Sequence, residues 1–177
     1  MKTHEFSVIA SGLDPSADDF EARFYDNGCD DALVSFQKGH IIVDFAREAE
    51  TLHEAISSAL ENLRVAGARI DRIEPDPLVG MAEIAKRADL SRAAITQYAK
   101  GQRGKDFPPP VARVTSDSPL WDWASVALWL ARKGKLTRDA ALDAATLRHA
   151  NRALEQGETR IAAMLAEDAA EYWEELA

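Results

Sequence analysis

Three side chains in a short polar segment, Arg92, Thr96 and Gln97, have the chemistry required to read the edges of nucleic-acid bases. A glutamine amide pairs with adenine through two hydrogen bonds, and an arginine guanidinium pairs with guanine in the same way. On a helix, positions separated by about one turn share a face, so these three side chains would point together. For any one of them alone, a solvated polar helix face is an equally good interpretation.

Basic side chains follow within the next 20 residues. We predict that they contact phosphates or the minor groove: Lys100, Arg103, Lys105 and Arg113. Cations near DNA phosphates release condensed counterions, so binding depends on local positive charge. Solubility is the alternative role for each cation, and the prediction therefore depends on their clustering.

The distribution of charge favours that clustering, although the net charge of the 177-residue chain is −9. Residues 77–136 contain 10 Lys and Arg against 5 Asp and Glu, which gives +5. The flanking segments are acidic, at −9 for residues 1–76 and −5 for residues 137–177. A basic segment between two acidic ones is consistent with a polyanion-binding surface confined to the middle of the chain.

The segment that must position these side chains, residues 80–100, reads GMAEIAKRADLSRAAITQYAK. It predicts two short helices joined by a tight turn at Asp89-Leu90, with Ser91 capping the second helix. Aspartate tolerates the left-handed backbone that this turn needs. The inward residues are then Ile84, Ala85, Ala88, Ile95 and Tyr98, and the exposed candidates on the second helix are Ser91, Arg92, Ala93, Thr96, Gln97 and Lys100. An ordinary helical hairpin is the alternative interpretation.

The residues after this helix pair predict a mobile basic loop, GQRGKD, and a stiff FPPP stretch. A small β-hairpin should join residues 111–114 to residues 119–121, and Asp122 should cap a further helix. We expect Trp121 and Trp129 to pack in the core. The role of Trp123 is less defined, and a base-stacking platform made by the tryptophans is an alternative.

Three stretches in this order, LVGMAEIAKRADLSRAAITQYAKG, DFPPPVARV and LWDWASVALWL, resemble the excisionase and AlpA-like branch of the MerR-type winged helix-turn-helix proteins. The resemblance covers residues 77–136, a third of the chain. It implies that the second helix enters the major groove of double-stranded DNA, and that the hairpin, or wing, lies along the backbone or an adjacent minor groove. The whole chain also resembles small bacterial helix-turn-helix transcriptional regulators, and this likeness implies no particular ligand or operator.

Before this segment, residues 1–76 predict an acidic domain with the element order β-α-β-β-α-β, which is typical of a ferredoxin-like sandwich. Strands are expected at 4–11, 31–37, 40–46 and 68–74. One helix should start at Asp14-Pro15, and a second should start at Thr51. The Pro75-Asp76-Pro77 sequence predicts a domain boundary. The fold class is therefore α+β.

After the central segment, residues 137–177 predict two Ala-rich helices, at 138–156 and 158–176, separated by Gly157. Ile161, Leu165, Tyr172 and Leu176 are candidates for a buried face. A single small DNA-reading motif offers little contact area, so we expect dimerisation, with these helices as the predicted interface.

Several observations argue against an enzyme or a membrane protein and favour the cytoplasm. No apolar run is long enough to span a bilayer, and no secretory signal is visible at the N-terminus. The histidines show no metal-ligand spacing, and the single cysteine, Cys29, lies beside two aspartates that disfavour a thiolate. We therefore predict no catalytic residues, no metal and no cofactor.

The leading hypothesis is a sequence-specific double-stranded DNA-binding protein that regulates transcription. One alternative is an antitoxin or a phage-type adaptor whose acidic N-terminal domain binds a protein partner. Another is a small-molecule sensor or an enzyme that uses the N-terminal domain, although a fold alone does not establish such a function.

Overall fold

The computed structural model of the chain describes residues 1–157 and 161–177, apart from the side chain of Ala162. The chain forms two compact units. The sheet unit comprises Met1–Pro75 with His149–Asp168, and the helical unit comprises Asp76–Arg148 with Ala169–Ala177. The break between Pro75 and Asp76 coincides with the predicted Pro-Asp-Pro boundary.

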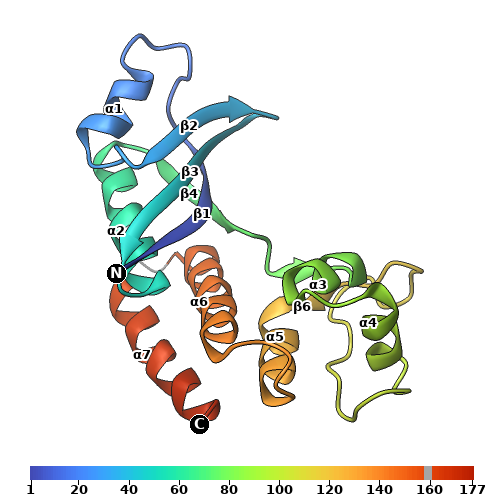
Figure 1. Ribbon diagram of the computed structural model, residues 1–177. Helices are drawn as coiled ribbons and strands as arrows, with labels where there is room; N and C mark the ends of the chain where they lie inside the picture. The colour runs from blue at the N-terminus through green and yellow to red at the C-terminus, as the bar shows by residue number, and fades with distance from the viewer. Residues whose placement is uncertain (158–160) are drawn as a thin grey trace. The chain divides into compact units, whose positions relative to one another are not determined.

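The sheet unit contains strands and helices in the predicted β-α-β-β-α-β order (Figure 1). These elements are β1 (Lys2–Ser11), α1 (Phe20–Asp26), β2 (Ala32–Gln37), β3 (His40–Ala49), α2 (Leu52–Val65) and β4 (Arg69–Glu74). The strands form one sheet in the order β2-β3-β1-β4, and every neighbouring pair is antiparallel. The two middle strands, β1 and β3, are therefore distant from each other in sequence order but adjacent in the sheet.

Alternation along the strands places one set of side chains in the core of the sheet unit. Val8, Val43 and Ile73, on three different strands, are fully buried. Helices α1 and α2 lie along the sheet (Figure 1). Along α2 the predicted apolar stripe is buried, from Leu52 to Leu63, and Thr51 caps the helix by accepting a hydrogen bond from the Glu54 amide at 3.3 Å. A helix with one apolar stripe must bury that stripe against another element, and here it packs on the sheet.

Helix α1 differs from its prediction, because it begins at Phe20 and not at Asp14-Pro15. The Asp14 carboxylate accepts hydrogen bonds from the amide and the hydroxyl of Ser16, at 2.9 and 2.7 Å. These bonds close a local turn and lower the pKa of Asp14. An aspartate can bond its own backbone two residues on as readily as it caps a helix, and sequence alone does not separate the two.

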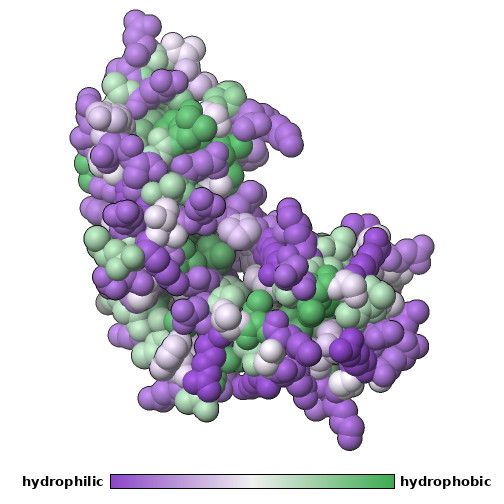
Figure 2. Space-filling view, in the orientation of Figure 1, coloured by the Kyte–Doolittle hydropathy of each residue, from purple (hydrophilic) through white to green (hydrophobic). Residues whose placement is uncertain are grey.

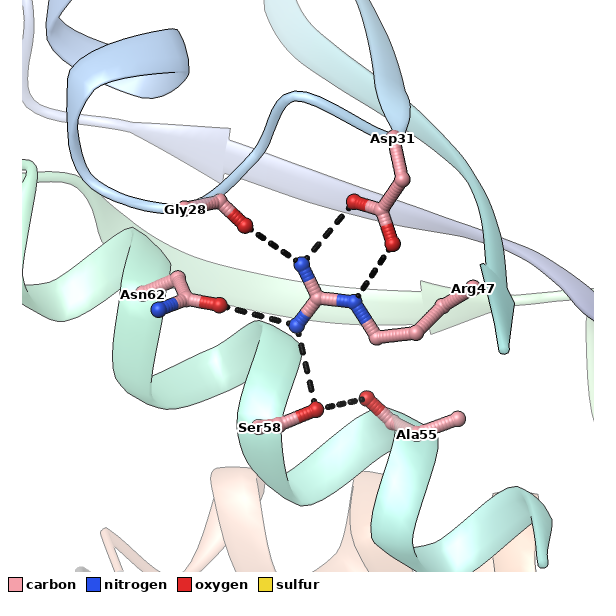
Figure 3. Close-up of polar contacts among 6 residues, drawn as sticks. All are labelled: Gly28, Asp31, Arg47, Ala55, Ser58 and Asn62. Carbon is pink, nitrogen blue, oxygen red and sulfur yellow. Dashed lines mark hydrogen bonds and ion pairs between the residues drawn. The ribbon is translucent and has the colours of Figure 1, made fainter. Parts of the chain in front are cut away.

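A buried arginine joins three parts of the sheet unit (Figure 3). Arg47 on β3 is 7% exposed, and its guanidinium donates to both carboxylate oxygens of Asp31 at 2.8 and 2.9 Å. It also donates to the Gly28 carbonyl at 2.7 Å, to Ser58 at 3.0 Å and to Asn62 at 2.8 Å. All five N–H donors are thereby used. Gly28 has a φ of +89°, and a Cβ there would lie 2.7 Å from the Asn62 amide nitrogen, so the loop requires glycine.

The helical unit contains α3 (Met81–Ala88), α4 (Arg92–Ala99) and α5 (Trp123–Arg132), together with a two-stranded sheet of β5 (Leu78–Val79) and β6 (Trp121–Asp122). Asp122 caps α5 as predicted, because its carboxylate accepts from the Ser125 amide at 3.2 Å. The pairing of β5 with β6 was not predicted. A two-residue strand carries no periodicity that a sequence can reveal.

The C-terminal segment forms two helices, α6 (Arg138–Glu155) and α7 (Ile161–Glu175), but it is not a third compact unit. Ala141, Ala144 and Leu176 belong to the core of the helical unit, whereas the residues from His149 to Asp168 belong to the sheet unit. Of the predicted buried face, Ile161, Leu165 and Leu176 are buried and Tyr172 is half-buried. These apolar side chains are already covered within one chain, which leaves fewer of them for the dimer contact expected of these helices.

Candidate nucleic-acid interface

The turn between α3 and α4 has the predicted left-handed residue. Asp89 has φ 51° and ψ 45°, and it ends α3. The Leu90 amide donates to the Ala85 carbonyl at 2.9 Å, and the Asp89 amide donates to the Lys86 carbonyl at 3.3 Å. This pair of bonds is a Schellman motif, which satisfies the last carbonyls of α3 and turns the chain sharply into α4.

The start of α4 is fixed by its cap and by two anchors. The Ser91 hydroxyl accepts a hydrogen bond from the Ala94 amide at 3.1 Å, as predicted for an N-cap. Ile95 is fully buried and Tyr98 is 5% exposed, in one cluster with Ile84 and Ala85 of α3. The side of α4 that carries Ile95 and Tyr98 is therefore held in the core. The opposite side of the helix is the one that remains for contact with solvent.

That opposite side exposes most of the predicted base-reading residues. Arg92, Ala93, Gln97 and Lys100 are exposed, and Ser91 is exposed beside them. Thr96 is less available, because it is half-buried and its hydroxyl donates to the Arg92 carbonyl at 2.9 Å. Among the described residues, the side chains of Arg92 and Gln97 have no hydrogen-bond partner, and their groups are of the kind that read guanine and adenine.

The basic loop after α4 contacts aromatic residues of the core. The Trp129 ring nitrogen donates to the Lys105 carbonyl at 2.8 Å, and the Arg103 guanidinium lies 5.3 Å from the Tyr98 ring centroid. Gly104 has a φ of +73°, and a Cβ there would lie 3.0 Å from Trp129. A core tryptophan thus contacts the loop at two places, while the side chains of Arg103 and Lys105 are exposed.

The predicted hairpin is present in a reduced form. A single β-bridge joins Ala112 to Leu120, with the Val111 amide donating to the Leu120 carbonyl at 2.8 Å. Arg113 lies at the start of the turn, exposed, with a φ of +51°. The hairpin is shorter than the predicted pairing of residues 111–114 with 119–121, but it still presents Arg113 to solvent.

The tryptophans of this region are core residues. Trp121, Trp123 and Trp129 are 3%, 7% and 8% exposed. The ring nitrogen of Trp121 donates to the Pro108 carbonyl at 3.0 Å. Buried rings offer no open face to a nucleotide base, so the alternative of a stacking platform made by these three residues is wrong.

The cations of the helical unit divide into paired and unpaired groups. Arg87 donates to Glu83 and to the Asp76 carbonyl, both at 2.9 Å, and Arg148 pairs with Asp122 at 2.7 Å. Within residues 1–157 and 161–177, no carboxylate forms an ion pair with the predicted DNA-contacting cations, namely Arg92, Lys100, Arg103, Lys105 and Arg113. All five predicted cations thus lack a carboxylate partner among the described residues, as exposed Lys86 and Lys135 also do, whereas Arg87 and Arg148 nearby are used structurally.

The structure adds one cation that the sequence did not single out. The Lys133 amine lies 5.5 Å from the centroid of the Trp129 ring, which also packs beneath Gly104. Lys133 therefore lies beside the basic loop. The spacing of Lys133 four residues after Trp129 is the signal that connects the two, because residues four apart on a helix face the same side.

Comparisons with known proteins give no family assignment: no protein-family model matches the chain, and no curated protein or solved structure is significantly similar to it. Among the helices that the structure describes, none combines the length and the apolar character needed to cross a membrane.

Proposed function

We propose that the chain is a sequence-specific double-stranded DNA-binding protein, and that its helical unit is a winged helix-turn-helix of the MerR type, in the excisionase branch. The observation that carries this proposal is the free, exposed face of α4, with Arg92 and Gln97 on it and unpaired cations at its C-terminal end. A recognition helix must combine a buried side that fixes its orientation with a polar side that reaches base edges.

In the proposed complex α4 enters the major groove, and Arg92 and Gln97 bond base edges. Lys100, Arg103 and Lys105 contact the phosphates on one side, together with Lys133. Arg113, at the turn of the wing, contacts the backbone or the adjacent minor groove. Phosphate contacts fix the register of the protein, and base contacts provide the specificity.

The sheet unit has the element order and strand order of a ferredoxin-like sandwich, and we propose that fold for it. Its acidic surface would be repelled by phosphates, so indiscriminate binding by this unit is disfavoured. We propose transcriptional regulation as the cellular role, since a protein that binds a specific DNA site can regulate a gene by occupying that site.

The test is selection of bound duplexes from a random pool, repeated with Arg92→Ala, Gln97→Ala and Lys100→Ala. The first two variants should lose discrimination at one base pair each, by about 1–3 kcal/mol. Lys100→Ala should weaken binding to all sequences and reduce the slope of log K against log salt by about one unit.

Lys2→Ala is the matched control, because it removes one exposed cation from the sheet unit and should change neither property. Failure to enrich any sequence, together with salt-independent binding of the pool, would show that the exposed face of α4 does not read DNA.

A further inference from the structure

The two edges of the four-stranded sheet differ in how they are protected. At the β4 edge, the Asn151 side chain donates to the Ile73 carbonyl at 2.9 Å and accepts from the Ile73 amide at 2.8 Å, as a neighbouring strand would. Four of the six β4 residues are also charged. The β2 edge reads ALVSFQ and contains no charged residue, proline or glycine. Native edge strands usually carry such features, because an unprotected edge pairs with other strands.

The backbone of β2 has groups available for that pairing. The Asp31 carbonyl accepts from the Ala46 amide at 3.1 Å, which fixes the phase of the hydrogen bonds between β2 and β3. Because bonding alternates along an antiparallel strand, Leu33 and Ser35 bond to β3. The amides and carbonyls of Val34 and Phe36 therefore point away from the sheet. The carbonyl of Ala32 points the same way.

Apolar side chains gather at this same edge, where Figure 2 shows hydrophobic residues over the region of β2. Leu33, Phe36 and Tyr25 are 70%, 50% and 66% exposed. A groove of about 360 Å³ lies between α1 and β2, lined by Tyr25, Ala32, Leu33 and Val34 and, on the α1 side, by Glu21 and Asp26. Phe36 lies on the same side of β2 as Ala32 and Val34.

We propose that the β2 edge binds the β2 edge of a second copy of the chain, antiparallel, about a two-fold axis at Val34. Each Val34 then exchanges two backbone hydrogen bonds with its counterpart, and each Phe36 amide donates to the Ala32 carbonyl of the other copy. Residues opposite each other in a sheet share a face, so each exposed Phe36 ring lies over the other copy's Ala32, in the groove beside α1. The result is an isologous interface in which each copy contributes a ring and a groove.

The charges beside β2 favour a second copy over an unrelated strand. Asp30 precedes Val34 by four residues, and Lys38 follows it by four, and both are exposed. Both lie in the turns that flank β2, with Lys38 at a φ of 53°, so neither belongs to the strand ladder. Antiparallel pairing centred on Val34 still brings the Asp30 end of each strand beside the Lys38 end of the other. Opposite charges across paired strands are favourable and like charges are unfavourable, so the charge pattern of this edge is complementary to itself. This inference concerns the sheet unit alone and does not depend on DNA binding.

The first test is sedimentation velocity of the full chain over concentrations up to about 100 µM, where mass action favours association. We expect a species of twice the 19.4 kDa chain mass. Phe36→Ala should weaken dimerisation about tenfold or more, because a ring in a groove acts as an anchor. Val65→Ala is the control: it removes a 62% exposed apolar side chain from the last residue of α2 and should change the dissociation constant by less than about threefold.

The second test exchanges the charges without altering the backbone of β2. Asp30→Lys alone and Lys38→Asp alone should each weaken the homodimer about tenfold, because two symmetric pairs become repulsive. The double variant should restore wild-type affinity. A mixture of the two single variants should form a heterodimer in preference to either homodimer, a result that follows from this register.

Three outcomes would overturn the proposal. The chain remains monomeric at the highest concentration, its dimer is insensitive to Phe36→Ala and to the charge variants, or Val65→Ala weakens it as much as Phe36→Ala does. If association appears only in the presence of a different protein, β2 binds a foreign strand and the proposal of a second copy is wrong. DNA binding by the monomer would leave the proposed function intact in each case.

Discussion

Replacing Arg47 with alanine should destabilise the sheet unit strongly, and its surroundings allow the loss to be estimated. The guanidinium is 7% exposed and makes five hydrogen bonds, two of them to the Asp31 carboxylate. Removing one partner of a buried ion pair typically costs about 3–5 kcal/mol, because the other charge stays behind without a partner. The Asp31 side chain is 30% exposed and keeps some contact with water, so we expect about 3 kcal/mol.

The chain carries separate probes for its two units. All four tryptophans, Trp121, Trp123, Trp129 and Trp173, belong to the helical unit, so their fluorescence reports on that unit. Cys29 is the single cysteine, is 2% exposed and belongs to the sheet unit. Because it lies at the groove between α1 and β2, its modification by a thiol reagent requires at least that part of the sheet unit to open.

With Arg47→Ala the rate of Cys29 modification should rise by about two orders of magnitude, which corresponds to about 3 kcal/mol when opening is fast and reversible. Far-UV circular dichroism during urea unfolding gives an independent value of the free-energy change. Arg47→Lys should recover only part of the loss, because an ammonium has three donors and lacks the planar fork that bonds a carboxylate twice.

Arg23→Ala is the matched control, since it removes an arginine that pairs with Asp19 at 2.8 Å but is 48% exposed. Exposed pairs contribute about 0–1 kcal/mol, so Cys29 should react at close to the wild-type rate. If Arg47→Ala and Arg23→Ala have the same small effect, the buried network does not hold the sheet unit together and the estimate is refuted.

Two further predictions concern individual sites. Burial raises the pKa of the Cys29 thiol from its ordinary value of 9.0 to about 11, so the folded sheet unit keeps a proton that the unfolded chain releases. The free energy of unfolding of the sheet unit should therefore fall between pH 9 and pH 11, by up to about 1.4 kcal/mol per pH unit. Urea unfolding at several pH values measures this dependence. Cys29→Ala should abolish the contribution of the thiol to the slope of free energy against pH. Gly104→Ala should destabilise the helical unit by about 1–3 kcal/mol, because the new Cβ combines a left-handed backbone with a close contact to Trp129. A tryptophan-fluorescence unfolding curve identical to that of the wild type would contradict the position we describe for this loop.

Local chemistry in the sequence determined the helix pair and its turn. Ser91 caps α4, Asp89 adopts the left-handed conformation, and Ile95 and Tyr98 point inward, as their residue types and spacing predicted. Each of these features depends on contacts within a few residues, so the sequence pattern contains nearly all the information needed. The order of elements in the sheet unit was predictable for the same reason, since period-2 and period-3.6 patterns are local.

Tertiary contacts decided what the sequence left open. Arg87 and Arg92 are five residues apart and look alike in sequence, yet Arg87 pairs with Glu83, whereas Arg92 forms no ion pair with any residue that the structure describes. The β4 edge is protected by Asn151, 78 residues away from Ile73, and the basic loop is held by Trp129, 24 residues away from Lys105. Such contacts form between side chains that meet only after the chain has folded, and no local pattern records them. The sequence therefore specified which groups were candidates, and the fold specified which of them remain free to bind.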